Sequence, residues 1–122
     1  MPHLTVSYTA ALAGAFDATA FAHEIFREAA AILDADPATF KARFTRIDDW
    51  VIGIDGAEAE KNWVQIFLDI ASGRTSEIKE ALAKAVLTIT EKTFAVPAGQ
   101  AIYVSADVRE LVPPGFQHTT LG

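Results

Sequence analysis

Apolar and polar positions follow two different periods along this chain: segments with strand alternation are followed by segments with helical spacing. Residues 4–8 alternate apolar and polar, which is the period of a β-strand with one buried face. Apolar residues then recur at helical spacing up to Pro37, and Asp17 or Thr19 is positioned to cap that helix. Strand alternation returns over residues 40–50. The first half therefore predicts a strand, a helix and a strand.

The second half repeats this order. A polar turn around Gly56 is followed by strand alternation from Trp63 to Ala71. Thr75 is a good N-cap for an amphipathic helix, and alternation returns over residues 101–110. We expect a single domain over residues 1–122, built from two βαβ units at about residues 2–55 and 60–111. The fold class is then α/β (α+β).

Two helices can cover only one face of a four-stranded sheet. We therefore predict both helices on one face and a second face without helices, called the bare face below. Its residues are too polar for a core and too regularly spaced for a loop, so we expect this face to meet other subunits. The predicted members are Thr5, Ser7, Lys41, Arg43, Gln65, Phe67, Asp69, Tyr103, Ser105 and Asp107.

The charge and the apolar fraction of the chain limit which classes of partner are expected. The chain carries 16 acidic and 10 basic side chains, a formal net charge of -6, and no basic stripe. Nucleic acids and anionic membrane surfaces are therefore not expected partners. An apolar fraction of 51% in a chain of 122 residues suggests that some apolar surface is left for association with further copies.

Cysteine is absent, which excludes disulfides, thiol nucleophiles and thiolate metal sites. The absence fits a reducing compartment, and we expect a cytoplasmic protein. The first residues carry no Lys or Arg ahead of the apolar positions, so they do not read as a secretory signal. No apolar run is long enough to predict a membrane span.

Few motifs suggest chemistry by themselves. His23–Glu24 begins like a zinc-protease motif, but Arg27 stands where the second histidine is needed, so no metal site is expected. Glu58 and Glu60 are expected in a solvated loop and form no catalytic pair. Arg74 follows a glycine and precedes a helix N-terminus, so it is a candidate anion-binding residue.

Pro2 is the unusual candidate. Aminopeptidase removal of Met1 would leave Pro2 with a free secondary amine, held in a ring at the start of a strand. An α-amino group has a pKa near 8, and burial or neighbouring cations lower it. Such an amine would serve as a general base near neutral pH.

Several stretches, in this order and spacing, resemble the 5-carboxymethyl-2-hydroxymuconate delta-isomerase family of the tautomerase superfamily. The likeness extends from Pro2 to about Leu111. The stretches that carry it are Pro2–His3, FKARFTRIDDWVIGIDG (40–56), LDIASGRTSEIKEAL (68–82) and SADVREL (105–111).

This resemblance implies a homotrimer and an isomerase of aromatic catabolism that needs no metal or cofactor. It implies that Pro2 moves a proton between carbons of a small carboxylated, unsaturated substrate. It also implies that arginines hold the carboxylates. Arg74 matches one family arginine, whereas the other falls at Lys41, with Arg43 two residues on. Lysine keeps the charge but loses the bidentate fork, so the exact substrate is left open.

Apolar walls from Phe67, Trp50 or Phe116 would exclude water and keep the amine neutral. Two alternatives are left open. One is another reaction on this scaffold, such as arylpyruvate tautomerisation, hydration or dehalogenation of a small unsaturated acid. The other is an oligomeric small-molecule binding protein without catalysis. Whether Met1 is lost separates this last alternative from the isomerase.

Overall fold

The computed structural model describes residues 2–56 and 61–122. Glu58 and Glu60, expected in a solvated loop, lie outside the described residues. The elements in chain order are β1 (His3–Thr9), η1 (Ala10–Leu12), α1 (Ala18–Leu33), η2 (Pro37–Thr39), β2 (Lys41–Ile47), β3 (Lys61–Ala71), α2 (Ser76–Thr93) and β4 (Ala101–Leu111). The predicted sequence of strand, helix and strand, used twice, is confirmed.

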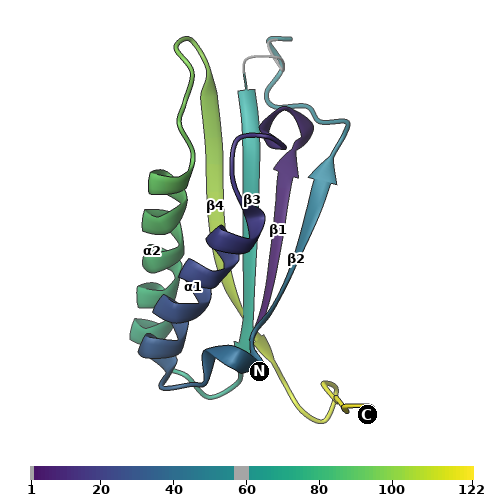
Figure 1. Ribbon diagram of the computed structural model, residues 1–122, viewed down its shortest axis with the longest axis vertical. Coiled ribbons are helices and arrows are strands. Elements are labelled where there is room, and N and C mark those ends of the chain that lie inside the picture. Colours follow the sequence, from purple (N-terminus) through teal and green to yellow (C-terminus); the bar gives the residue numbers. More distant parts are fainter. Residues whose placement is uncertain (1, 57–60) are drawn as a thin grey trace.

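The strands form one four-stranded sheet in the order β2-β1-β3-β4 (Figure 1). β1 is parallel to β2, and β3 is parallel to β4, so each βαβ unit contributes a parallel pair. The two units meet through antiparallel pairing of β1 with β3. A two-fold repeat of one motif thus becomes a single continuous sheet.

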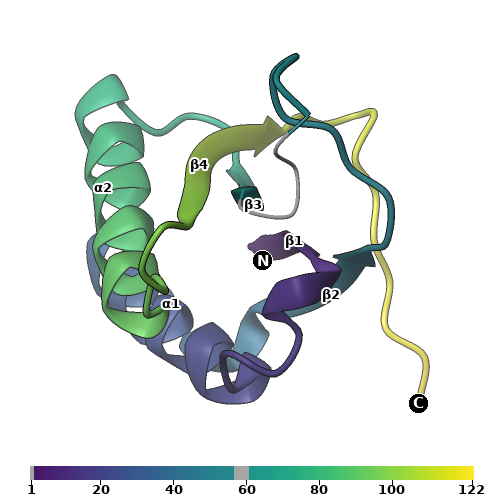
Figure 2. The same ribbon diagram turned by 90° about the horizontal axis from the view of Figure 1, so that it is seen from above.

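Both helices lie on the same side of the sheet, as predicted (Figures 1 and 2). Viewed from above, the helices follow the outside of the curved sheet, while the segment after β4 runs past its other side (Figure 2). Alternating strand residues point toward the helices, and the residues between them form the bare face.

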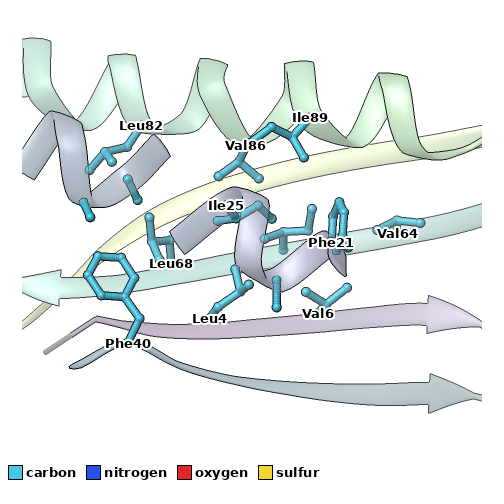
Figure 3. Close-up of a cluster of buried hydrophobic side chains, with 14 of the residues drawn as sticks. Leu4, Val6, Phe21, Ile25, Phe40, Val64, Leu68, Leu82, Val86 and Ile89 are labelled. Atoms are coloured by element: carbon cyan, nitrogen blue, oxygen red, sulfur yellow. The ribbon is translucent and has the colours of Figure 1, made fainter. Parts of the chain in front are cut away.

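The core lies between the helices and the two central strands (Figure 3). Leu4 and Val6 of β1 are 1% and 0% exposed, and burial of each such side chain stabilises the fold by about 1.5–3 kcal/mol. The side chains that meet them come from β3, α1 and α2, and include Val64, Leu68, Phe21, Ile25, Leu82, Val86 and Ile89. This packing holds β1 in place, and with it the N-terminal residues.

Side-chain oxygens cap both helices. Asp17, and not Thr19, accepts a hydrogen bond from the Ala20 backbone N–H at 3.1 Å. Thr75 accepts one from the Ile78 backbone N–H at 3.2 Å. Each cap satisfies one of the N–H groups left without a partner in a helical first turn. The Thr75 cap also fixes where the loop after β3 ends.

Two details differ from the sequence prediction. The strand expected over residues 40–50 covers Lys41–Ile47, and Asp48, the next residue, pairs with Arg46 at 2.9 Å. Ala42 shares a strand face with the apolar residue Phe44, yet it is exposed, because β2 is an edge strand. Strand alternation reports which residues share a face, but it does not report where the covering layer stops.

Among the described residues, no helix is both long enough and apolar enough to cross a membrane.

Candidate active site

Chain segments far apart in the sequence meet at one end of the sheet. β1 and β2 begin there, and β3 and β4 end there, because of the strand directions in the sheet (Figure 1). Pro2 immediately precedes β1 and is buried. Its carbonyl accepts a hydrogen bond from the Lys41 backbone N–H at 3.1 Å. Pro2 is therefore held at this end of the sheet by backbone pairing with β2.

Lys41 and Arg43 lie on the bare face beside the first residues of β1. Lys41 is directly opposite His3, and Arg43 is opposite Thr5. A hollow of about 150 Å³ is lined by His3, Leu4, Lys41, Ala42 and Arg43. Among the described residues, no carboxylate forms an ion pair with Lys41 or Arg43. Two uncompensated cations thus face one hollow.

Arg74 lies in the short loop between β3 and α2. The loop begins where β3 ends, and Gly73 adopts a φ of +102°, a conformation that side chains other than glycine rarely tolerate. Arg74 is half-buried. Because His3 pairs with Asp69 near the end of β3, this loop leaves the sheet at the end where Pro2 enters it. Arg74 is not among the residues that line the Lys41–Arg43 hollow.

His3 was not singled out from the sequence, yet it lies in the centre of this region. Its ring contacts Phe116 edge-to-face, with centroids 5.8 Å apart. Partial burial and then the positive charge of Lys41 lower the pKa of His3, although Asp69 opposes the shift. The signals present in the sequence were its position next to Pro2 and its alternation with Thr5 and Ser7.

A second hollow is lined in part by Phe116, the residue whose ring contacts His3 of the first hollow. It measures about 270 Å³ and lies between the end of β3 and the segment after β4. Its lining is mostly apolar: Ala71, Ser72, Leu111, Pro113, Phe116 and His118. The Phe116 ring also stacks on His118, with centroids 5.7 Å apart. The contact between the Phe116 and His3 rings thus links the lining of the apolar hollow to that of the basic hollow.

The structure separates the three aromatic residues considered as walls of the site. Phe116 contacts His3, as described above. Phe67 lies on the bare face beneath Arg109, whose guanidinium carbon is 3.9 Å from the ring centroid. Trp50 donates its indole N–H to the Lys61 carbonyl at 2.9 Å, at the start of β3 and so at the opposite end of the sheet. Trp50 therefore does not belong to this region.

His23, weighed as part of a zinc motif, is exposed on α1 and its ring lies against Phe26. Within residues 2–56 and 61–122, no three or more side chains of the ligand types His, Asp and Glu gather closely enough to hold a metal ion.

The region combines three chemical features. Cations at Lys41, Arg43 and Arg74 suit an anionic ligand, since guanidinium and ammonium groups form charge-assisted hydrogen bonds with carboxylates. The apolar hollow suits a carbon skeleton. Pro2, at the start of β1, lies between β2, which carries Lys41 and Arg43, and β3, which leads to Arg74. The arrangement fits a small, carboxylated organic molecule.

Comparisons with known proteins show the family. The family model of 5-carboxymethyl-2-hydroxymuconate isomerase matches residues 2–120. A crystal structure of a 5-carboxymethyl-2-hydroxymuconate isomerase from Deinococcus radiodurans R1 is similar at 25% identity and a TM-score of 0.74, covering 98% of this chain and 90% of that one. No curated protein matches the chain.

Two further solved structures share the fold. A 5-carboxymethyl-2-hydroxymuconate delta-isomerase aligns at 12% identity with a TM-score of 0.81, covering 100% of this chain and 89% of that one. A protein described as "Q0 fused 4-OT wild type symmetric trimer" aligns at 20% identity with a TM-score of 0.65, covering 89% of this chain and 85% of that one.

The position of Lys41 beside His3 predicts a measurable electrostatic coupling. Lys41→Met removes a positive charge that disfavours the imidazolium, so the pKa of His3 should rise toward its ordinary value, as followed by NMR titration of the ring protons. Lys84→Met removes an exposed lysine on α2 that pairs with Glu80 at 2.8 Å, and should leave the His3 pKa unchanged.

The same shift makes stability depend on pH. Because the folded-state pKa of His3 is lowered, the unfolded chain binds more protons below a pH of about 6.5. The contribution of His3 to stability is complete above that pH and is lost as the pH falls toward the folded-state pKa. Lys41→Met should make this loss shallower, and an unchanged His3 pKa would contradict the coupling.

Proposed function

The chain belongs to the 5-carboxymethyl-2-hydroxymuconate isomerase family, and from this premise we propose which reaction it catalyses and how. The chain is an isomerase of the tautomerase type. The proposed reaction moves a proton between carbon atoms of a small, carboxylated, unsaturated substrate of the hydroxymuconate type, without a cofactor. The observation that carries the proposal is the buried Pro2 at the sheet end where Lys41 and Arg43 have no acidic partner among residues 2–56 and 61–122.

Pro2 is the proposed general acid and base, after removal of Met1. A secondary amine attached to the first strand is positioned by the backbone pairing of its own carbonyl with Lys41. Burial and the neighbouring cations both disfavour the protonated amine, so both lower its pKa toward neutral pH. A base with a pKa close to the working pH can remove a proton from one carbon and return it to another.

Arg74 is the proposed first ligand of a substrate carboxylate, and Lys41 and Arg43 share the second position. Removal of a proton next to a conjugated carbonyl places negative charge on oxygen, and fixed cations stabilise that charge as it develops. Arg74 offers a bidentate fork, whereas Lys41 offers a point charge. The pair of Lys41 and Arg43 on one strand face supports recognition of two carboxylates in one substrate.

The apolar hollow next to Phe116 is the proposed location of the substrate carbon skeleton. Its residues leave little polar surface, so a substrate placed there displaces water from the proton-transfer site. Exclusion of water keeps the Pro2 amine unprotonated and strengthens its interactions with charge. The absence of cysteine from the sequence supports a cytoplasmic location for this reaction.

A homotrimer is the proposed assembly. The bare face carries half-buried and exposed side chains in regular rows, among them Phe67 and Tyr103, which is 50% exposed. Val51 and Ile54 are more exposed still, at 77% and 105%. This much exposed apolar surface in a small chain is typical of an interface between subunits. The structural similarity to a protein described as a symmetric trimer supports three copies.

The first test concerns the amine. On a muconate-type substrate, kcat/KM should rise with pH along a limb that follows the Pro2 amine. Retention of Met1 converts this nitrogen into an amide, so the limb should vanish and activity should fall by about 10²–10⁴-fold. Mass spectrometry establishes the state of the N-terminus in each preparation.

Pro2→Ala is the matched variant. It keeps a terminal amine but changes its pKa and geometry, so it should weaken the reaction without abolishing it. Full activity in a chain that retains Met1 would end the proposal. Arylpyruvate and small halogenated or unsaturated acids, assayed in parallel, separate the proposed reaction from the other reactions considered for this scaffold.

The second test concerns carboxylate binding. Arg74→Ala removes one charge-assisted contact, which should lower kcat/KM by roughly 10–100-fold. A rise in KM alone would mean that the contact is equally strong in the ground state, and a fall in kcat would mean that it strengthens in the transition state. Arg27→Ala on α1 removes an exposed arginine and should leave both constants unchanged. Unaltered kinetics in Arg74→Ala would remove Arg74 from the site.

The third test concerns the assembly. Sedimentation equilibrium at micromolar concentration should give about three times the chain mass of 13.1 kDa. Tyr103→Glu places a charge on the bare face and should shift the distribution toward monomer. Leu121→Glu, at a residue that is 91% exposed near the end of the chain, is the control and should leave the mass unchanged. A stable monomer in the unmodified protein would refute the trimer.

A further inference from the structure

Asp69 and Arg109 form a closely bonded ion pair on the bare face. The Arg109 Nε donates to Asp69 Oδ1 at 2.7 Å, and its Nη2 donates to Oδ2 at 3.1 Å, which is a bidentate arrangement. The Asp69 side chain is only 12% exposed, whereas that of Arg109 is 47% exposed. The guanidinium also lies over the Phe67 ring at 3.9 Å. Arg109 is thus fixed from two directions over a largely buried carboxylate.

This pair is continuous with the basic hollow. Asp69 is directly opposite His3 in the antiparallel pairing of β1 with β3, and His3 is directly opposite Lys41. Asp69 is opposite Arg109 in the pairing of β3 with β4. Directly opposite residues on adjacent strands point to the same face and have neighbouring Cβ atoms. One row therefore crosses the whole sheet in the order Lys41, His3, Asp69, Arg109.

Within this row, Asp69 has the wrong charge for the proposed substrate. A carboxylate one strand away from His3 repels an anion in the basic hollow, and it favours protonation of any amine or imidazole nearby. Arg109 offsets part of that charge at close range, and the remaining part still opposes the lowering of the His3 pKa. The hydrogen bond to Asp69 raises the pKa of Arg109, so the guanidinium stays charged throughout the pH range of the reaction.

We propose that Arg109 is a positioning residue that neutralises Asp69, so that the row presents net positive charge from Lys41 to a dicarboxylate substrate. This inference rests on the proposed function, because it assumes an anionic substrate and a base near the N-terminus. It assigns to Arg109 a role that acts through Asp69 and requires no contact with the substrate. The competing role is a simple clamp between β3 and β4.

The charged groups around His3 come from four parts of the chain. β2 contributes Lys41 and Arg43, and β3 contributes Asp69. β4 contributes Arg109, which acts through Asp69. The segment after β4 contributes His118, which lies beyond the Phe116 ring. Loss of Arg109 changes only the net charge of the Asp69–Arg109 pair and leaves the other groups in place. The His3 pKa therefore reports this change directly.

The test compares three variants, R109M, D69N and the double variant D69N/R109M. In R109M the exposed negative charge should raise KM for a dicarboxylate substrate on the order of ten-fold. It should also move the acidic limb of kcat/KM, and the NMR pKa of His3, to higher pH. D69N/R109M removes both charges and should return KM, the limb and the His3 pKa close to their original values.

A clamp between strands predicts the opposite pattern. The double variant would then be as impaired as R109M, losses would follow the melting temperature, and the pKa of His3 would not move. That result would overturn the inference. R109K keeps the charge without the bidentate fork, so its KM should stay close to that of the unmodified protein. R109K also keeps the inference testable if R109M folds poorly.

A matched control lies at the other end of the sheet. Arg46 pairs with Asp48 at 2.9 Å, and R46M breaks an Arg–Asp pair of similar length without touching the row. R46M should leave KM and the His3 pKa unchanged. If the unmodified protein does not isomerise any carboxylated substrate, the proposed function fails. The His3 titration still reports whether Arg109 masks Asp69 in that case, so the two failures are distinguishable.

Discussion

The antiparallel pairing of β1 with β3 is the contact on which the rest of this structure depends. Each βαβ unit forms a parallel strand pair, but only the pairing of His3 through Tyr8 with Val64 through Asp69 joins the units into one sheet. Because the directions of all strands follow from it, the starts of β1 and β2 meet the ends of β3 and β4. Pro2, Lys41 and the Arg74 loop are thereby gathered at one end, although they are separated by up to 72 positions in the chain.

Local electrostatics at this end run against the charge of the whole chain. The net charge is -6, yet Lys41 and Arg43 lie on the bare face without acidic partners among the described residues. The carboxylate in the same row, Asp69, forms an ion pair with Arg109. An anion approaching this end therefore meets positive charge at short range, where Coulomb interactions in a partly buried site outweigh distant, solvent-screened charges. The same cations lower the pKa of His3 after the larger effect of burial.

The segment after β4 gives the site its apolar wall. Phe116 follows the last strand by a few residues and reaches the ring of His3, at the opposite terminus of the chain. Phe116 lines the apolar hollow together with Leu111 and Pro113, while His3 lines the basic hollow. A carboxylated hydrocarbon needs both environments close together, and here the contact between the two rings links them.

The amino-acid sequence by itself determined the elements, the face on which each strand residue lies and the candidate chemistry at Pro2 and Arg74, whereas Lys41 and Arg43 were added by the resemblance to a family. These follow from short-range causes: side-chain period, helix caps such as Thr75, and the chemistry of each residue type. Only the tertiary structure decided that β1 pairs with β3, that Ala42 is exposed on an edge strand, and that His3, Asp69 and Arg109 share one row. Alternation fixes which face a side chain takes but carries no information about which strand lies next to it. Partners across a sheet are selected by packing of the whole core, so residues 40 or more positions apart become neighbours only once the chain is folded.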